Sequence, residues 1–304
     1  GRVGAAREAF ASAAALTDDP GLLARAALGY ADPGADLGIA YRSEDAQTPE
    51  LLARAIDAQP DGDSVALVRL EARLAAELHF SDAPDRAREL ARSAVAGAGR
   101  LGDPRAAGAA WAVMHDAYVV GQAPLDEQLR GSAQLLEWAQ RAGTAGAHLT
   151  AHRARVFDLL AAADLHGVDA EVLAFRRVAE PLGVPGYLWW LDVWSAMRAL
   201  LEGRHEAAET RAVAACELGV ASFPVLAVIN LSFLLFFLRR EQGRLAAMEE
   251  GPRDVAASHP DVPAIRVALA LLLAETGRAH EARGLVAALA TDLDPLHDRH
   301  WPAP

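Results

Sequence analysis

The sequence predicts an all-α fold, a right-handed solenoid built from stacked antiparallel helical hairpins. Alanine and leucine dominate the 304 residues, and both are strong helix formers. Hydrophobic residues make up 52% of the chain but aromatic residues only 6%, and alanine and leucine far outnumber valine and isoleucine, so a large β-sheet is disfavoured. Short polar turns recur at near-constant spacing between apolar helical stretches, which is the pattern of a repeat array.

An elongated array also suits the length of the chain, which is long for one compact core and short for two large domains. In such an array each unit packs only against its neighbours. We expect an N-terminal partial repeat with an irregular loop over 1–47, the repeat array over 48–292 and a tail over 293–304. The chain begins at Gly1 in what looks like the second half of a repeat, so we expect a fragment of a longer protein.

Charge and residue usage exclude several function classes. The net charge is −12, and all 29 basic residues are arginine. Without lysine there is no phosphate-binding P-loop and no lysine Schiff base. An acidic chain is also poorly suited to nucleic-acid phosphates, which need clustered positive charge. The replacement of lysine by arginine resembles the composition of proteins from high-GC actinobacteria.

Cys216 is the only cysteine, so an internal disulfide and a cysteine zinc site are excluded, and a reducing, cytoplasmic setting is favoured. No signal peptide is visible. The most apolar stretch, 225–238, is too short for a bilayer-spanning helix and contains Asn230 and Ser232, so we expect a buried helix there.

The turns that define the repeat each join an apolar helix to an alanine-rich one. From Ser81 onward they follow one another at intervals of 34 to 42 residues, within the range of helical repeats. The turns lie at Gly1-Arg2, Ser81-Asp82, Gly121-Gln122, Ala163-Asp164, Gly203-Arg204, Gly243-Arg244 and Gly277-Arg278.

The repeat predicts two amphipathic helices in each unit. First helices are expected over 64–79, 104–120, 145–162, 185–201, 222–241 and 261–275. Second helices are expected over 84–98, 125–142, 169–182, 204–218, 244–258 and 278–290. The stretch 31–47 contains Asp32-Pro33-Gly34 and other turn formers, so it predicts a longer loop.

The residues after the turns resemble the tetratricopeptide repeat, which places a small, a bulky and a small residue at fixed offsets after the turn glycine. Ala6, Phe10 and Ala13 match this pattern after Gly1. The turns at Gly203, Gly243 and Gly277 depart from it. The resemblance implies a tetratricopeptide-like superhelix in which the first helices line a concave groove.

The sequence segments 198–204 and 238–245 resemble the helical-repeat region of large actinobacterial signalling ATPases, among them the ATP-binding LuxR-type regulators. In that family an ATPase module precedes the repeats and an output domain, such as a DNA-binding or cyclase domain, lies elsewhere in the chain. The resemblance implies an interaction or sensor arm that regulates transcription through such modules and has no cofactor of its own.

Projecting the groove-facing positions of tetratricopeptide arrays onto the predicted first helices gives an apolar, aromatic surface with a few polar groups. Such a surface is typical of a site for a peptide, a protein or a small effector. The candidate binding residues are Trp111, His115, Tyr118, Arg153, Phe157, Trp190, Met197, Asn230, Phe233, Phe237 and Arg240.

Alternatives stay open for several of these residues. The aromatic cluster at the start of 185–201 fits core packing between repeats as well as a groove, and His115 fits a core position. Arg153 and Arg240 suit clamping of a carboxylate, or else surface ion pairs. Asp158 is assigned no role. As a second hypothesis, the chain is a small-molecule receptor with an enclosed pocket around Trp111 and Trp190.

The search for catalytic or metal-binding groups predicts none. No serine-hydrolase elbow, zinc-protease motif or glycine-rich dinucleotide loop is present. Cys216 lacks an identifiable activating histidine and fits a small buried side chain. The histidines and aspartates near the end of the chain could ligate zinc, but they fit a solvated tail better; they are Asp294, His297, Asp298 and His300.

The acidic composition leads to a first prediction. The purified chain should not retard duplex DNA in a gel-shift assay at moderate salt, because a net charge of −12 repels phosphate. A clear shift that disappears at higher salt would contradict this prediction.

Overall fold

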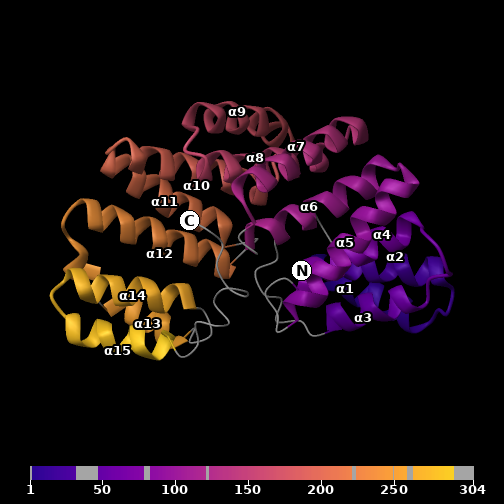
Figure 1. The fold of residues 1–304 in the computed structure, drawn as a ribbon, viewed down its shortest axis with the longest axis horizontal. Coiled ribbons are helices and arrows are strands. Elements are labelled where there is room, and N and C mark those ends of the chain that lie inside the picture. Colours follow the sequence, from indigo (N-terminus) through magenta and orange to yellow (C-terminus); the bar gives the residue numbers. More distant parts are fainter. Residues whose placement is uncertain are drawn as a thin grey trace. The chain divides into compact units, whose positions relative to one another are not determined.

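The computed structural model describes residues 2–31, 47–78, 83–120, 123–220, 224–248, 250–258 and 263–290. In these ranges the chain consists of helices joined by short turns and contains no β-strand, which confirms the predicted all-α fold (Figure 1). The predicted loop over 31–47 lies outside the described residues except at its two ends, Ala31 and Gln47, which belong to helices. The predicted tail over 293–304 lies wholly outside them.

The chain divides into two compact units, each of which is described by itself. The first runs from Gly1 to Val178. It contains α1 (Arg2–Ala15), α2 (Pro20–Ala31), α3 (Gln47–Asp57), α4 (Val65–Leu78), α5 (Pro84–Leu101), α6 (Pro104–Val120), α7 (Leu125–Ala142), α8 (Ala145–Ala161) and most of α9 (Leu165–Leu182).

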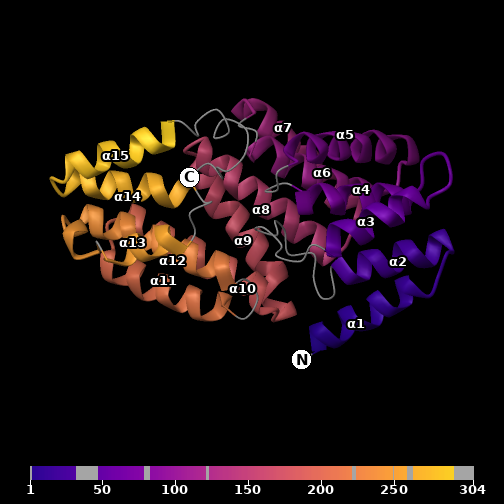
Figure 2. The same cartoon turned by 90° about the horizontal axis from the view of Figure 1, so that it is seen from below.

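The first unit is built in two layers. Helices α2, α4, α6 and α8 pack side by side and form what we call the first layer. Helices α3, α5 and α7 form the second layer, and each packs against the two first-layer helices that flank it (Figure 2). Because every hairpin contacts the next one along the chain, the arrangement is that of a helical solenoid.

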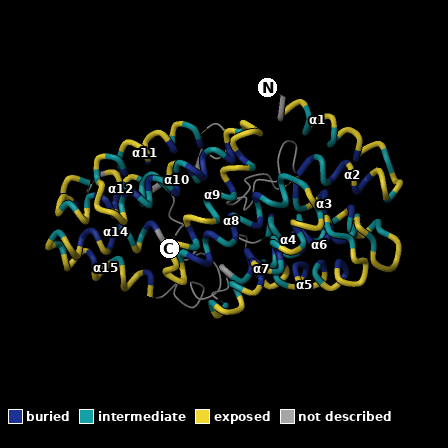
Figure 3. Tube along the Cα trace, turned by 90° about the horizontal axis from the view of Figure 1, so that it is seen from above, coloured by how far each residue is buried: buried dark blue, intermediate teal, exposed yellow. Residues whose placement is uncertain are grey.

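Alanine fills many of the contacts between these helices. Ala27 on α2, Ala75 on α4 and Ala110 on α6 are all 0% exposed. A small side chain at such a contact lets two helix axes approach closely. One continuous cluster of buried side chains extends from α1 to α6, and Figure 3 shows buried and exposed positions alternating along most of its helices. The core therefore runs along the unit from hairpin to hairpin.

The second unit begins at Ala179. It contains α10 (Pro185–Leu201), α11 (His205–Gly219), α12 (Pro224–Glu241), the 3-10 helix η1 (Leu245–Met248), α13 (Glu250–Ser258), α14 (Pro263–Glu275) and α15 (Ala279–Ala290). Helices α10 and α11 form one tight hairpin and α14 and α15 another, while α12 packs against α11.

The predicted helix over 244–258 is the main departure from the expected elements. The structure has η1 and then α13 in its place. Pro252 lies in the first turn of α13, a position that proline tolerates because its missing N–H has no partner in the preceding turn. The apolar stretch 225–238 lies in α12, so the expected helix is present. It is not buried as expected, because most of its described side chains are half-buried and Val228 and Phe237 are exposed. None of the described helices is both long and apolar enough to cross a membrane.

Four of the turns that define the repeat lie wholly within the described residues, and they share one backbone geometry. Ala163, Gly203, Gly243 and Gly277 all have a left-handed φ, of 57°, 70°, 66° and 84°. In each turn the next residue donates its N–H to a carbonyl five residues back, as Asp164 does to Leu159 at 2.9 Å and Arg204 to Ala199 at 2.9 Å. This is the Schellman motif, which satisfies the last carbonyls of a helix. The equivalence inferred from sequence at these four turns is confirmed.

Ala163 is the one non-glycine residue with a positive φ in the described part of the chain, so it gives a stability prediction. Ala163→Gly should raise the free energy of unfolding by about 0.5–1 kcal/mol, because the left-handed conformation is strained for a residue with a Cβ. The matched reversal, Gly203→Ala, should lower it by about 1 kcal/mol. Urea unfolding measures both. If both substitutions changed the free energy of unfolding in the same direction, the two turns would not share this geometry.

Candidate functional site

A pocket of about 310 Å³ opens on the first layer of the first unit. All four helices of the first layer contribute to it: α2, α4, α6 and α8. We call it the arginine pocket, because four arginines line it beside a single carboxylate, that of Asp116. The arginines are Arg25 on α2, Arg69 and Arg73 on α4, and Arg153 on α8.

Alanines on α4 and α6 supply much of the remaining lining of the arginine pocket. They are Ala72, Ala76, Ala109 and Ala112. Their methyl groups offer no hydrogen bonds, so the directional contacts in the pocket come from the guanidinium groups, Asp116 and Thr150. The same small residues that let the helices approach thus leave a shallow apolar surface between charged side chains.

Arg153 is a buried arginine, with 4% of its surface exposed. Its Nη2 lies 3.6 Å from Oδ1 of Asp116 on α6. Its guanidinium also lies over the ring of Phe157, 5.8 Å from the ring centre. A buried charge requires such partners, because an isolated ion loses its hydration. The ion pair also ties α6 to α8 beside the pocket.

Arg73 is held from two directions. Its Nη2 donates to the carbonyl of Ala31 at the end of α2, at 3.0 Å, and to Oε1 of Glu77 at 2.5 Å. The Glu77 side chain is nearly inaccessible to solvent. Arg73 therefore joins α2 to α4, and much of its charge is compensated within the fold.

His115 and Asp158 form a buried pair between α6 and α8. His115 Nε2 lies 2.9 Å from Asp158 Oδ1, and the two residues are 2% and 0% exposed. His115 Nδ1 lies 3.8 Å from the carboxylate of Asp116, beyond hydrogen-bonding distance, and has no hydrogen-bond partner among the described residues. Burial by itself lowers the pKa of His115, but the carboxylates of Asp116 and Asp158 outweigh it and raise this pKa above its usual value.

The projection of groove-facing positions from the sequence placed some of the pocket-lining residues correctly and misplaced others. Thr150 and Arg153 lie at the groove-facing offsets counted back from the turn at Ala163, and both line the pocket. On α6 the lining residues are shifted by one position from those projected. The same offsets counted from Gln122 instead of Gly121 give Ala109, Ala112 and Asp116.

No groove-facing position was projected onto α4, and the sequence analysis therefore missed the residues that this helix contributes to the pocket. Counting from Asp82 instead of Ser81 gives Arg69, Ala72 and Ala76, all of which line the pocket. The connections from α4 to α5 and from α6 to α7 are longer than the connection from α8 to α9. In these two repeats, counting back from the first residue of the turn therefore does not give the residues that line the pocket. The clustering of Arg69 and Arg73 on one helix face was the available signal.

The other candidates of the first unit pack between helices. Trp111 is half-buried and packs against a cluster of buried side chains of α7 and α8, which are Leu135, Ala139, Ala151 and Ala154. Tyr118 lies against Gly131 on α7, where an added Cβ would come within 3.2 Å of the ring. Phe157 lies beneath Arg153, as described above. Of the five candidates in this unit, Arg153 is the one that lines the arginine pocket.

The tryptophan cluster lies on α10 in the second unit. Trp190 is 9% exposed, stacks on Trp194 with ring centres 5.6 Å apart, and contacts Trp189 at 4.6 Å. Trp189 is fully buried and sits over Gly219 of α11, where a Cβ would lie 2.6 Å from its ring. Met197, one turn beyond Trp194, is half-buried.

The candidates on α12 differ in exposure. Asn230 and Phe233 are half-buried, and the Asn230 side-chain amide donates to the Leu226 carbonyl of its own helix at 3.0 Å. Phe237 is 40% exposed and meets Phe236 edge to face. Arg240 is exposed and pairs with Glu275 on α14 at 2.9 Å, which matches the surface ion pair considered for it.

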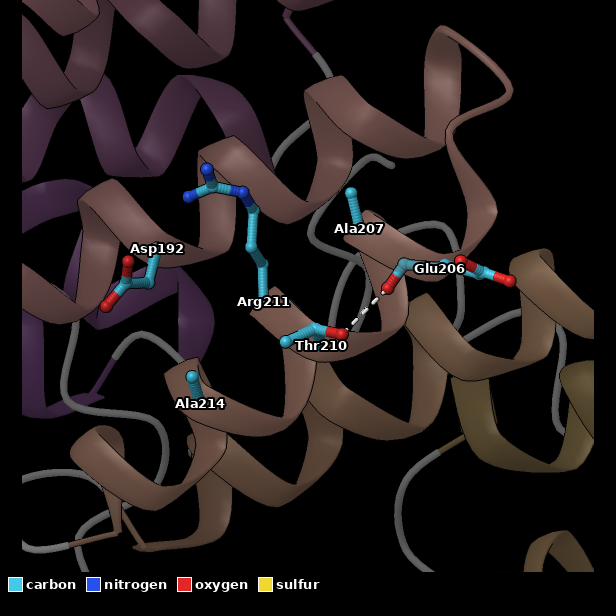
Figure 4. Close-up of a pocket in the computed structure, with 6 residues that line it drawn as sticks. All are labelled: Asp192, Glu206, Ala207, Thr210, Arg211 and Ala214. Carbon is cyan, nitrogen blue, oxygen red and sulfur yellow. Dashed lines mark hydrogen bonds between the residues drawn. The ribbon is translucent and has the colours of Figure 1, made fainter.

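A second hollow, of about 500 Å³, lies on α10 and α11 of the second unit. Figure 4 shows Asp192 and Arg211 on its lining, with Thr210 donating to the Glu206 carbonyl of its own helix at 2.9 Å. Glu206, Thr210, Arg211 and Ala214 are all exposed. Charges of both signs on an open helix face are typical of a solvated surface, so we assign this hollow no function.

Cys216 and a possible metal site are the two candidates for chemistry that the sequence raised. Cys216 is half-buried, and burial together with Glu217 raises the pKa of its thiol, which disfavours the reactive thiolate. No cluster of three potential metal ligands occurs among the described residues. The group formed by Asp294, His297, Asp298 and His300 lies outside them.

The fold and the pocket together define the class of the protein as an α-helical repeat array. The sequence matches no model of a known protein family, and it matches no curated protein.

The buried His115–Asp158 pair predicts a pH-dependent stability. Because the folded state raises the pKa of His115, its stabilising effect is present below the unfolded value of about 6.5 and is lost as the pH rises through the folded value. Asp158→Asn should lower the free energy of unfolding by about 1–3 kcal/mol at pH 6 and flatten its decline toward pH 8.

Urea unfolding at several pH values measures this effect. Asp192→Asn makes the same chemical change at a half-buried aspartate of α10 and serves as the control. An unchanged pH slope in Asp158→Asn would show that His115 is not the titrating group.

Proposed function

We propose that this chain is a non-catalytic interaction arm of a bacterial regulator, and that it binds a peptide or a peptide-like segment of a protein across the first layer of its N-terminal unit. The observation that carries the proposal is the arginine pocket, to which all four helices of the first layer contribute. A binding surface assembled from consecutive repeats is the usual way in which solenoids engage their partners.

The extent of the pocket favours a peptide over a compact ligand. Neighbouring packed helices have axes 8–10 Å apart, so four of them span roughly 25–30 Å. An extended peptide covers that distance with about eight residues. The alternative receptor hypothesis centres on Trp111 and Trp190. It receives less support, because neither residue lines the arginine pocket and each packs within the core of its own unit.

The regulatory context rests on the resemblance of 198–204 and 238–245 to the repeats of signalling ATPases. These segments end α10 and α12 and include the turns at Gly203 and Gly243. In the proposal, ATPase and DNA-binding modules belong to the same longer chain in the reducing cytosol, a setting that the single cysteine favours. Occupation of the first layer then biases the output module through a change in the repeat array.

A peptide-display selection on the purified chain tests the proposal. Selected peptides should bind the wild-type protein and lose about tenfold or more in affinity to Thr150→Trp, because the indole fills the arginine pocket. The matched variant Thr210→Trp places the same bulk in the second hollow and should leave their affinity unchanged.

Circular dichroism and thermal unfolding would establish that both variants fold. Peptides that bind the two variants equally well, or a selection that enriches no binder, would contradict the proposal.

A further inference from the structure

The charge of the arginine pocket is opposite to that of the whole molecule. The chain has a net charge of −12, yet the pocket gathers four arginines around one carboxylate. Positive charge concentrated in one depression of an acidic protein focuses the local electrostatic field on that depression. The positive charge of the pocket therefore indicates a negatively charged ligand.

The four arginines differ in whether they pair with other groups of the protein. Arg73 pairs with Glu77, and Arg153 lies beside Asp116. Arg25 and Arg69 are exposed, and no hydrogen bond or ion pair to either is found among the residues that the structure describes. These two side chains lie on neighbouring helices, α2 and α4, at one end of the pocket. They are the groups available to an incoming anion.

The uncharged lining supplies a different kind of contact, and it includes Ala72 and Ala76 on α4 as well as alanines on α6. Ala109 and Ala112 on α6 present methyl groups, and the nearby charges of Asp116 and Arg153 already face each other. A ligand that matches this layout carries negative charge toward the two exposed arginines and apolar groups toward the alanines. Small anions match the first feature but not the second.

We propose that the arginine pocket recognises an acidic peptide segment, whose side-chain carboxylates pair with Arg25 and Arg69 while apolar side chains rest on the alanines of α4 and α6. Guanidinium groups bind carboxylates through paired N–H donors, which gives both charge and geometry. This inference rests on the proposed function and names the chemistry of its partner. Nucleic acid is the less suitable polyanion, because the rest of the chain repels it.

Fluorescence anisotropy with designed peptides tests the inference. The probe is a labelled, C-terminally amidated peptide in which glutamate alternates with leucine, so that only side-chain carboxylates carry negative charge. Its counterpart has glutamine at every glutamate position. The glutamate peptide should bind at least about tenfold more tightly than the glutamine peptide, and its binding should weaken as salt is added.

Two double variants separate the pocket from the overall charge. Arg25→Ala with Arg69→Ala should weaken binding of the glutamate peptide by about tenfold. Arg86→Ala with Arg92→Ala removes the same charge from exposed positions on α5 and should change the affinity little. All four positions are exposed or at a pocket edge, so both proteins are expected to fold, and circular dichroism checks this.

Three outcomes would overturn the inference: no preference for glutamate over glutamine, equal losses in the two double variants, or full displacement of the peptide by citrate or inorganic phosphate at matched charge concentration. The last outcome would assign the pocket to a free small anion. The proposed function fails separately. If display selection yields neutral or basic peptides that Thr150→Trp excludes, the interaction arm stands and the acidic partner does not.

Discussion

Every hairpin in this chain has an apolar face that it can bury only against the next hairpin. This constraint sets the order of contacts in the first unit, where each second-layer helix lies between two first-layer helices. It also explains the abundance of alanine at the contacts, since close approach of the helices brings more apolar surface together. A single hairpin would leave that face in water. The stability of each unit therefore comes largely from the contacts between neighbouring hairpins.

The same constraint shapes the arginine pocket. Helices joined by small side chains leave a shallow surface between them, and long side chains at its edges can reach across it. Arginine suits such a position, because its apolar stem packs on the helix while its charged end stays accessible. Arg73 and Arg153 also join helices through their polar contacts, whereas Arg25 and Arg69 are exposed and make no hydrogen bond or ion pair among the described residues. In the proposal, two of these arginines hold the helices together and the other two bind the ligand.

Much of the fold could be predicted from the sequence. The helices α4, α6, α8 and α10 lie within one or two residues of the predicted ranges, because the turns between them recur and their geometry depends on local backbone bonds. The pocket was harder to predict. Its register on α4 and α6 depends on the length of the following connection, and the role of Asp158 depends on a contact with His115, far away in sequence. Periodicity within a helix defines a face, but only packing decides what that face meets.

A ligand in the arginine pocket would touch four hairpins at once. Without it, stability passes from neighbour to neighbour, and a hairpin at one end can open while distant ones remain closed. With it, opening any of the four would also break contacts to the ligand, so the free energy of binding would be shared among elements that do not otherwise meet. The occupant would behave as a splint along the array, and a stretch of loosely coupled repeats would unfold as one cooperative block.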